Sequence, residues 1–173
     1  NPSASDDYFR FFGIHQQFNI DLPALDQAYL TIQKEVHPDR HARGSEAEQR
    51  VAMQMATFAN TAYQTLKNPI QRGLYLCQLH SVDAKLETNT SMPAAFLMKQ
   101  MEWRESLDEQ AEDLPALEEL MSEVEQSKEN ILQEIAQAID VAKNYTHAAE
   151  LLRGLLFIDK FAVELDDTIA ALI

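Results

Sequence analysis

The chain has 173 residues, 46% of them hydrophobic, with only four glycines and six prolines. This composition favours an all-α fold in one domain or two small ones and excludes wholesale disorder. No stretch reaches the roughly 18 uninterrupted apolar residues of a membrane span, and the single Cys77 excludes an internal disulfide or a thiolate cluster. Because the first residues are polar and then aromatic, we expect no signal peptide and a cytoplasmic location.

The net charge of −14 is unevenly distributed along the chain. Residues 1–83 carry nine acidic side chains against seven Lys and Arg, whereas residues 84–173 carry nineteen against seven. Such an acidic surface disfavours nucleic acid as a partner. A basic protein partner for the second half is one interpretation, and an acidic face in contact with solvent is the commoner one.

A short helical turn and a longer helix are predicted at the N-terminal end. The turn covers 7–12 and ends at Gly13, and the helix covers 22–36, with Asp21 as its N-cap and Pro23 in its first turn. One apolar stripe along this helix contains Leu25, Ala28, Tyr29, Ile32 and Val36.

A second long helix is predicted over 46–67. Ser45 and Glu48 form a capping box at its start, and Asn68-Pro69 closes it. Its apolar stripe contains Val51, Met55, Phe58, Ala59, Ala62 and Leu66. Because each long helix has one apolar face, we expect the two to pack as an antiparallel hairpin.

The tripeptide His37-Pro38-Asp39 lies between these two helices. Pro38 must end the first helix, because proline has no N–H to donate and disfavours helical geometry at the preceding residue. A His and an Asp on a tight loop favour a protein–protein contact over catalysis, since no nucleophile accompanies them. Two alternatives stay open, an ordinary polar loop and metal-dependent hydrolysis by His37, Asp39 and His41. No second cluster of His or Cys completes such a metal site.

The second half is predicted to be a separate helical bundle. Residues 70–80 stay apolar and helical in character, and 81–91 are polar without periodicity, which predicts a linker or bend. Short connections between the helical segments that follow predict an antiparallel three-helix bundle, with Asp113 as the N-cap of its second helix. These segments cover 92–111, 114–143 and 147–171.

One stripe of the first bundle helix has two interpretations. Leu97, Met98 and Met101 lie at helical spacing, and taken alone such a stripe is more often core than interface. An apolar patch edged by carboxylates also suits a protein interface, in which methionine packs adaptably. Phe157 and Trp103 are packed helix residues by default. The carboxylates that follow the stripe at steps of three and four belong to Glu102, Glu105 and Glu109.

Both flanks of the tripeptide resemble the J-domain, the module that activates the ATPase of heat-shock-70-class chaperones. Tyr29, preceded by Ala28, lies eight residues before His37, as in J-domains. The matching residues of the second flank are Asn60, Thr61, Ala62, Tyr63, Gln64, Thr65 and Leu66, then Asn68, Pro69, Arg72 and Tyr75. A lone His-Pro-Asp is a weak signal, and the two matched flanks make it a strong one.

The second half is similar to one group of J-proteins, the HscB family of bacterial iron–sulfur cluster assembly. Two segments carry this resemblance, AFLMKQME at 95–102, followed by Arg104-Glu105, and RGLLFIDK at 153–160. The resemblance implies an all-α fold in which an N-terminal J-domain is joined to a C-terminal three-helix bundle. The implied parts are a J-domain at 1–75, a connecting segment at 76–90 and a scaffold-binding bundle at 91–173.

The resemblance implies a co-chaperone, not an enzyme, that brings the cluster scaffold IscU to the specialised chaperone HscA and stimulates ATP hydrolysis by HscA. The implied chaperone-binding residues are His37, Pro38, Asp39, Lys34 and Arg40, with Asp39 pairing with an arginine of the ATPase domain. The implied scaffold-binding residues are Leu97, Met98, Met101, Glu102, Glu105, Glu109 and Phe157. We expect no nucleotide, metal, cluster or other cofactor bound to the chain itself.

The chain departs from general J-domains in its charge. Those carry several Lys and Arg along the helix before the tripeptide, whereas here that helix has only Lys34, with Arg40, His41 and Arg43 just after it. Electrostatic docking should therefore be weaker and more selective, which suits a dedicated chaperone partner better than a general one of the DnaK type. The alternative function is a J-domain adaptor for a different client, without an iron–sulfur role.

Overall fold

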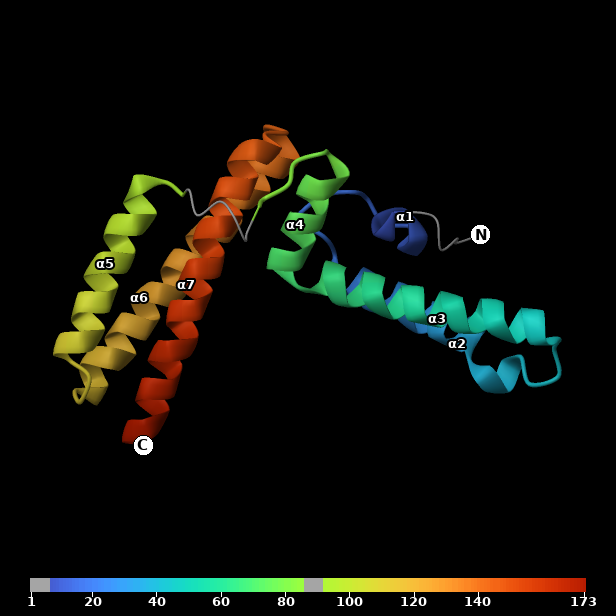
Figure 1. The fold of residues 1–173 in the computed structure, drawn as a ribbon, viewed down its shortest axis with the longest axis horizontal. Coiled ribbons are helices and arrows are strands. Elements are labelled where there is room, and N and C mark those ends of the chain that lie inside the picture. Colours follow the sequence, from blue (N-terminus) through green and yellow to red (C-terminus); the bar gives the residue numbers. More distant parts are fainter. Residues whose placement is uncertain (1–6, 86–91) are drawn as a thin grey trace. The chain divides into compact units, whose positions relative to one another are not determined.

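Residues 7–85 and 92–173 are described by the computed structural model, and every regular element within them is helical, which confirms the predicted all-α class (Figure 1). The elements are α1 (Tyr8–Phe12), α2 (Leu22–Val36), the 3-10 turn η1 (Pro38–Arg40), α3 (Glu46–Lys67), α4 (Pro69–Leu79), α5 (Ala94–Glu109), α6 (Leu114–Ala136), the π-helical turn η2 (Gln137–Val141) and α7 (Tyr145–Leu172).

The chain divides into two compact units, one up to Leu76 and one from Cys77 onward, so the division falls inside α4. The family resemblance divides the chain at 1–75, 76–90 and 91–173, and this division stays a prediction. Part of the predicted connecting segment, 86–90, lies outside the described residues. No helix of the described chain is both long and apolar enough to cross a membrane.

Side-chain caps begin the helices where the sequence predicts them. Asp21 accepts a hydrogen bond from the backbone N–H of Ala24, and Ser45 Oγ accepts one from Glu48. Asp113 caps α6 in the same way, through the N–H of Ala116. Each oxygen satisfies one of the N–H groups that a first helical turn leaves without an intrahelical partner.

The first unit is a hairpin of α2 and α3 with α1 packed against both helices (Figure 1). The rings of Tyr29 and Tyr63 stack across the hairpin with centroids 4.0 Å apart. The Tyr63 hydroxyl donates to the Asp26 carboxylate at 2.6 Å, and this hydrogen bond raises the pKa of Tyr63. The hydroxyl of Tyr29 lies 3.2 Å from the side-chain oxygen of Asn60. These contacts set the register of α2 against α3.

Two further residues of the J-domain pattern connect α4 to the same unit. The guanidinium of Arg72 is buried, donates to the backbone carbonyl of Leu66 at 2.7 Å and lies over the ring of Phe18. The hydroxyl of Tyr75 accepts a hydrogen bond from the backbone N–H of Tyr8 at 3.0 Å, and burial raises the pKa of Tyr75. The flanking residues of the pattern therefore hold the hairpin together, whereas the tripeptide lies outside its core.

The predicted apolar stripe of α3 is wrong at its first residue. Ala52, not Val51, is buried, and Val51 is exposed. The buried face of α3 contains Ala52, Ala59 and Tyr63, at steps of seven and four, and Val51 lies about 100° around the helix from Ala52. Because Val51 and Ala52 are both apolar, periodicity alone does not decide which of the two is buried.

The second unit contains a three-helix bundle of α5, α6 and α7 (Figure 1). Ion pairs between neighbouring helices give its register: Lys99 with Glu123 at 3.2 Å, Lys128 with Asp159 at 3.0 Å, and Arg104 with Glu164 at 2.7 Å. Neighbours in the chain are antiparallel, as predicted, and α5 and α7 run parallel. The buried core includes Trp103, Leu107, Leu117, Val124, Ile135, Leu152, Leu155 and Leu165.

The predicted helix over 114–143 is not uniform. The α-helix ends at Ala136, and η2 follows, in which the backbone N–H of Ala142 donates to the carbonyl of Gln137, five residues back. Lys143 then takes a left-handed conformation, with φ at 55°. A π-turn inserts one residue into a helix without ending its apolar stripe, since Ala138 and Ile139 are still buried. Periodicity alone cannot distinguish such a turn from a continuing α-helix.

Gly154, in the middle of α7, allows close approach of α5. A Cβ at this position would overlap the ring of Phe96. We predict that Gly154→Ala destabilises the bundle by about 1 kcal/mol. Overpacking costs about 1–3 kcal/mol, and it exceeds the gain of about 0.5–1 kcal/mol from alanine in a helix interior. Urea unfolding followed by the fluorescence of Trp103, the single tryptophan, measures this bundle directly.

The double variant Phe96→Ala with Gly154→Ala provides the control for this prediction. When Phe96→Ala removes the ring, Gly154→Ala should become stabilising, because only the helix propensity remains. The same loss of stability in both backgrounds would contradict the assignment of this glycine to the contact with Phe96.

Cys77, at the end of α4, is buried in the second unit, as its apolar neighbours predict. Its Sγ lies 3.6 Å from the backbone carbonyl of Tyr145, and the ring of Tyr145 stacks on His80. Burial raises the pKa of the Cys77 thiol to about 11, although the nearby guanidinium of Arg153 acts in the opposite direction. The thiol is therefore protonated and unreactive at neutral pH.

Candidate functional site

The tripeptide forms the turn that connects α2 to α3 at the closed end of the hairpin. His37 ends α2, and Pro38 begins η1. The backbone N–H of Asp39 donates to Nδ1 of His37 at 3.2 Å, so the imidazole caps the turn. The Asp39 side chain is 95% exposed, and its Oδ2 lies 3.7 Å from the same nitrogen. The turn therefore presents a carboxylate to solvent from a backbone held by hydrogen bonds.

Two side chains hold the loop that follows the tripeptide. Nε2 of His41 lies 2.7 Å from the backbone oxygen of Glu35, and since a carbonyl only accepts, this nitrogen donates. The amide nitrogen of Gln49, on α3, lies 3.3–3.4 Å from the carbonyls of His41, Ala42 and Gly44. The loop is thus connected to the end of α2 and to the start of α3.

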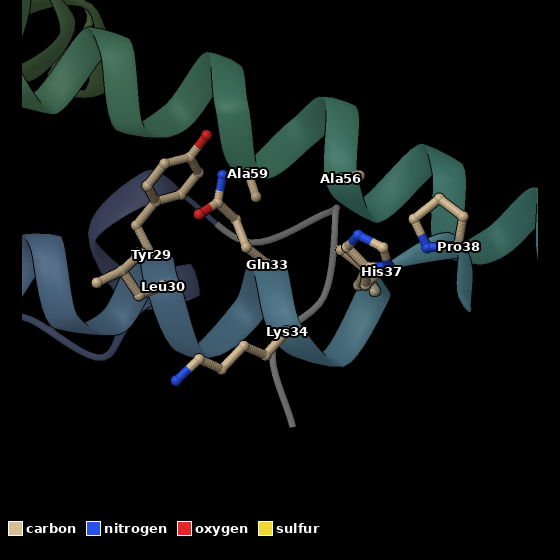
Figure 2. A pocket seen from close by; sticks show the side chains of 9 residues that line it. Tyr29, Leu30, Gln33, Lys34, His37, Pro38, Ala56 and Ala59 are labelled. Atoms are coloured by element: carbon tan, nitrogen blue, oxygen red, sulfur yellow. The ribbon is translucent and has the colours of Figure 1, made fainter. Parts of the chain in front are cut away.

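A groove about 590 Å³ in volume lies beside the turn, between α2 and α3 (Figure 2). Lys34 extends from α2 on the side away from α3, at the rim of this groove (Figure 2). The groove is lined by Tyr29, Leu30, Gln33, Lys34, Val36, His37, Pro38, Ala56 and Ala59. Three of the sequence-predicted chaperone-binding residues therefore share one groove, while Asp39 and Arg40 follow it on the exposed turn.

The structure does not bring His37, Asp39 and His41 together as the ligands of a metal ion. No group of three or more His, Cys, Asp and Glu in residues 7–85 and 92–173 is placed to hold a metal ion. The imidazole of His41 already donates to a backbone carbonyl, and Nδ1 of His37 accepts from the backbone. The turn can present the Asp39 carboxylate to another protein from a backbone that hydrogen bonds hold in place.

The second candidate surface lies on the outer face of α5. Leu97, Met98 and Met101 are 48%, 63% and 72% exposed, whereas Trp103 on the same helix is buried. The stripe that could have been bundle core is therefore open to solvent. The carboxylates of Glu102, Glu105 and Glu109 are exposed along the same helix.

Phe157 contributes to the same region from α7. It is 38% exposed, although a phenylalanine in an apolar helix is a core residue by default. Gly154 lies against Phe96, and Phe161 stacks on Trp103 at 5.9 Å, so Phe157 lies between these two contacts, at the same level along the bundle as Leu97 and Met101 of α5. Lys160 lies over its ring at 5.7 Å. Helix register thus brings together residues 56 or more positions apart in the chain.

Leu30, in the groove beside the turn, is not among the site residues predicted from the sequence. Leu30 is 48% exposed and lines the groove beside the turn. It lies next to Tyr29 in the sequence but off the buried stripe, about 100° around the helix. An apolar residue on the polar face of a helix was the signal available in the sequence.

A helical hairpin closed by an exposed His-Pro-Asp turn, with an Arg and a Tyr of α4 packed against it, defines a J-domain protein. Residues 92–166 match a protein family described as the HSCB C-terminal oligomerisation domain. A protein of Ralstonia nicotianae named Co-chaperone protein HscB homolog is 48% identical to this chain over 91% of each chain. The chain belongs to the HscB family of co-chaperones.

Solved structures show the same similarity. Human co-chaperone protein HscB superimposes with a TM-score of 0.86 at 29% identity, covering 95% of this chain and 83% of the human chain. Chaperone HscB from Vibrio cholerae superimposes with a TM-score of 0.81 at 31% identity, covering 97% of this chain and all of the other. Both similarities include the J-domain and the helical bundle.

Proposed function

We propose that this co-chaperone binds an iron–sulfur scaffold of the IscU type, delivers it to a chaperone of the HscA type and stimulates the ATPase of that chaperone in the cytoplasm. Cluster maturation or transfer would follow from this coupling. Membership of the HscB family supports the proposal. The observation that carries it is the exposed carboxylate of Asp39 on a turn held by hydrogen bonds.

The first contact of the proposal is made by the turn. Asp39 pairs with an arginine of the chaperone's ATPase domain and promotes hydrolysis there without entering the chemistry. A charge-assisted hydrogen bond of this kind is strong enough to orient a partner. His37 and Pro38 hold the turn, and Lys34 and Arg40 supply cations on either side of it along the chain.

The second contact is made by the exposed face of α5 with Phe157. Leu97, Met98 and Met101 supply apolar surface, and methionine adapts to an irregular partner. The carboxylates of Glu102, Glu105 and Glu109 form a polar border, as interfaces usually have. Two binding surfaces on one chain raise the effective concentration of scaffold at the chaperone without any new contact between the two.

The test is steady-state ATP turnover by an HscA-type chaperone with an IscU-type scaffold, while this protein is titrated. We expect turnover to rise well above the level that the scaffold alone produces. No rise at saturating protein would overturn the proposal. Calorimetric titration with the scaffold distinguishes the proposed function from the alternative one. A J-domain adaptor for a different client would stimulate the chaperone and bind no scaffold.

A further inference from the structure

The groove beside the turn is nearly uncharged. Lys34 alone among its nine lining residues carries a formal charge at neutral pH, with His37 counted as neutral. A second pocket, of about 370 Å³, adjoins it, shares Val36, Pro38 and Ala56 with it, and is lined by no Lys, Arg, Asp or Glu. The surface that lines these two hollows is therefore mostly apolar or neutral.

A partner that reaches Asp39 must cover part of this surface. A specific protein–protein interface buries about 800 Å² on each partner, which is more than a three-residue turn can supply. The groove is the adjoining surface that includes His37 and Pro38 of the tripeptide itself. The pocket of about 370 Å³ includes only Pro38.

Leu30 is the apolar side chain of this groove that would bury the most exposed area if a partner covered it. It is 48% exposed although it lies beside half-buried Tyr29 and Val36. Covering its exposed half removes apolar area from water, whereas Gln33 and Lys34 remain able to keep their polar ends hydrated at the rim. One apolar anchor beside one cation is the combination that the groove offers.

We propose that the chaperone of the preceding section docks an apolar side chain into this groove against Leu30, with at most one carboxylate opposite Lys34. The inference rests on the proposed function and specifies the chemistry of the partner surface. Affinity comes from apolar burial, and the charge pair at Asp39 supplies orientation. Binding should consequently depend little on salt, because screening weakens exposed charge pairs and leaves apolar burial intact.

The experiment measures the concentration of this protein that gives half-maximal stimulation of HscA-type ATPase activity. Leu30→Ala should raise that concentration about tenfold, as expected for loss of an interface anchor. Leu22→Ala is the matched control, since Leu22 is 43% exposed on the same helix and does not line the groove. It should change the value less than twofold, in keeping with a contact outside the interface. Met53→Ala tests the adjoining pocket.

The same titration is repeated between about 50 and about 300 mM salt, over which the Debye length falls from roughly 14 Å to roughly 6 Å. The half-maximal concentration for the parent protein should change less than about threefold, after correction for the salt response of the chaperone alone. A Leu30→Lys variant should bind more weakly than the parent at every salt concentration.

Three results would overturn the inference. These are equal behaviour of Leu30→Ala and Leu22→Ala, a large effect of Met53→Ala alone, and a steep loss of stimulation with salt. Stimulation by an Asp39→Asn variant would instead refute the proposed function itself. The two failures are therefore distinguishable in one set of titrations.

Discussion

Asp39→Asn is expected to abolish stimulation of the chaperone ATPase, with at least about a thirtyfold loss at concentrations where the parent protein is effective. Removing one partner of a hydrogen-bonded charge pair costs about 2–5 kcal/mol. Because the Asp39 side chain is 95% exposed, its replacement by an amide of the same shape has no cost inside the hairpin. The measurement is ATP turnover in the presence of saturating scaffold.

Glu46→Gln is the matched control for this variant. Glu46 is an exposed carboxylate in the first turn of α3, close in the chain to the same loop, so both variants remove one negative charge from this end of the hairpin. Glu46→Gln should retain full stimulation, and both variants should bind the scaffold as the parent does. Stimulation by Asp39→Asn equal to that by Glu46→Gln would refute the role of the tripeptide.

The double variant Leu97→Ala with Met101→Ala is expected to weaken scaffold binding about a hundredfold. Truncation of a buried interface anchor commonly costs more than about 1 kcal/mol, and two anchors are removed here. Both side chains are about half or more exposed, and alanine favours the helix, so α5 should stay intact. Calorimetry or fluorescence titration with an IscU-type scaffold measures the change.

Val163→Ala provides the comparison for the scaffold face. Val163 is an exposed apolar residue of α7, four residues beyond the Asp159 that pairs with α6, and so lies away from the face of α7 that meets α5. Its truncation should leave scaffold binding unchanged. The double variant should also keep the scaffold-independent part of chaperone stimulation. A scaffold affinity equal to that of the parent protein would remove α5 from the proposed interface.

Much of the candidate chaperone site was predictable because its determinants are local. Pro38 cannot continue α2, because it has no N–H to donate, and Ser45 with Glu48 favours a helix start, so the turn between two helices follows from neighbouring residues. The groove beside the turn is different. It depends on which part of α2 lies opposite Ala56 and Ala59 of α3, and on the exposure of Leu30.

The scaffold face shows the same division between local and long-range information. The spacing of Leu97, Met98 and Met101 places them together on one helix but suits core and surface equally. Trp103 and Leu107 point into the bundle, and this leaves the stripe on the outside. Phe157 lies nearby because Gly154 and Phe161 of α7 meet Phe96 and Trp103 of α5. That register depends on residues far apart in the chain.

The all-α class, the helix starts at Asp21, Ser45 and Asp113 and the turn at His37-Pro38-Asp39 follow from local sequence, because capping, proline geometry and apolar periodicity act over a few residues. The family follows from the resemblance of the quoted motifs. The last helix begins at Tyr145, two residues before the predicted position. Three features follow from helix packing instead: Val51 is exposed, Leu30 lines a groove, and the helix after Ala136 continues as a π-turn. These features depend on which face of a helix meets its partner and on how closely that partner approaches, and both properties are set by residues far apart in the chain.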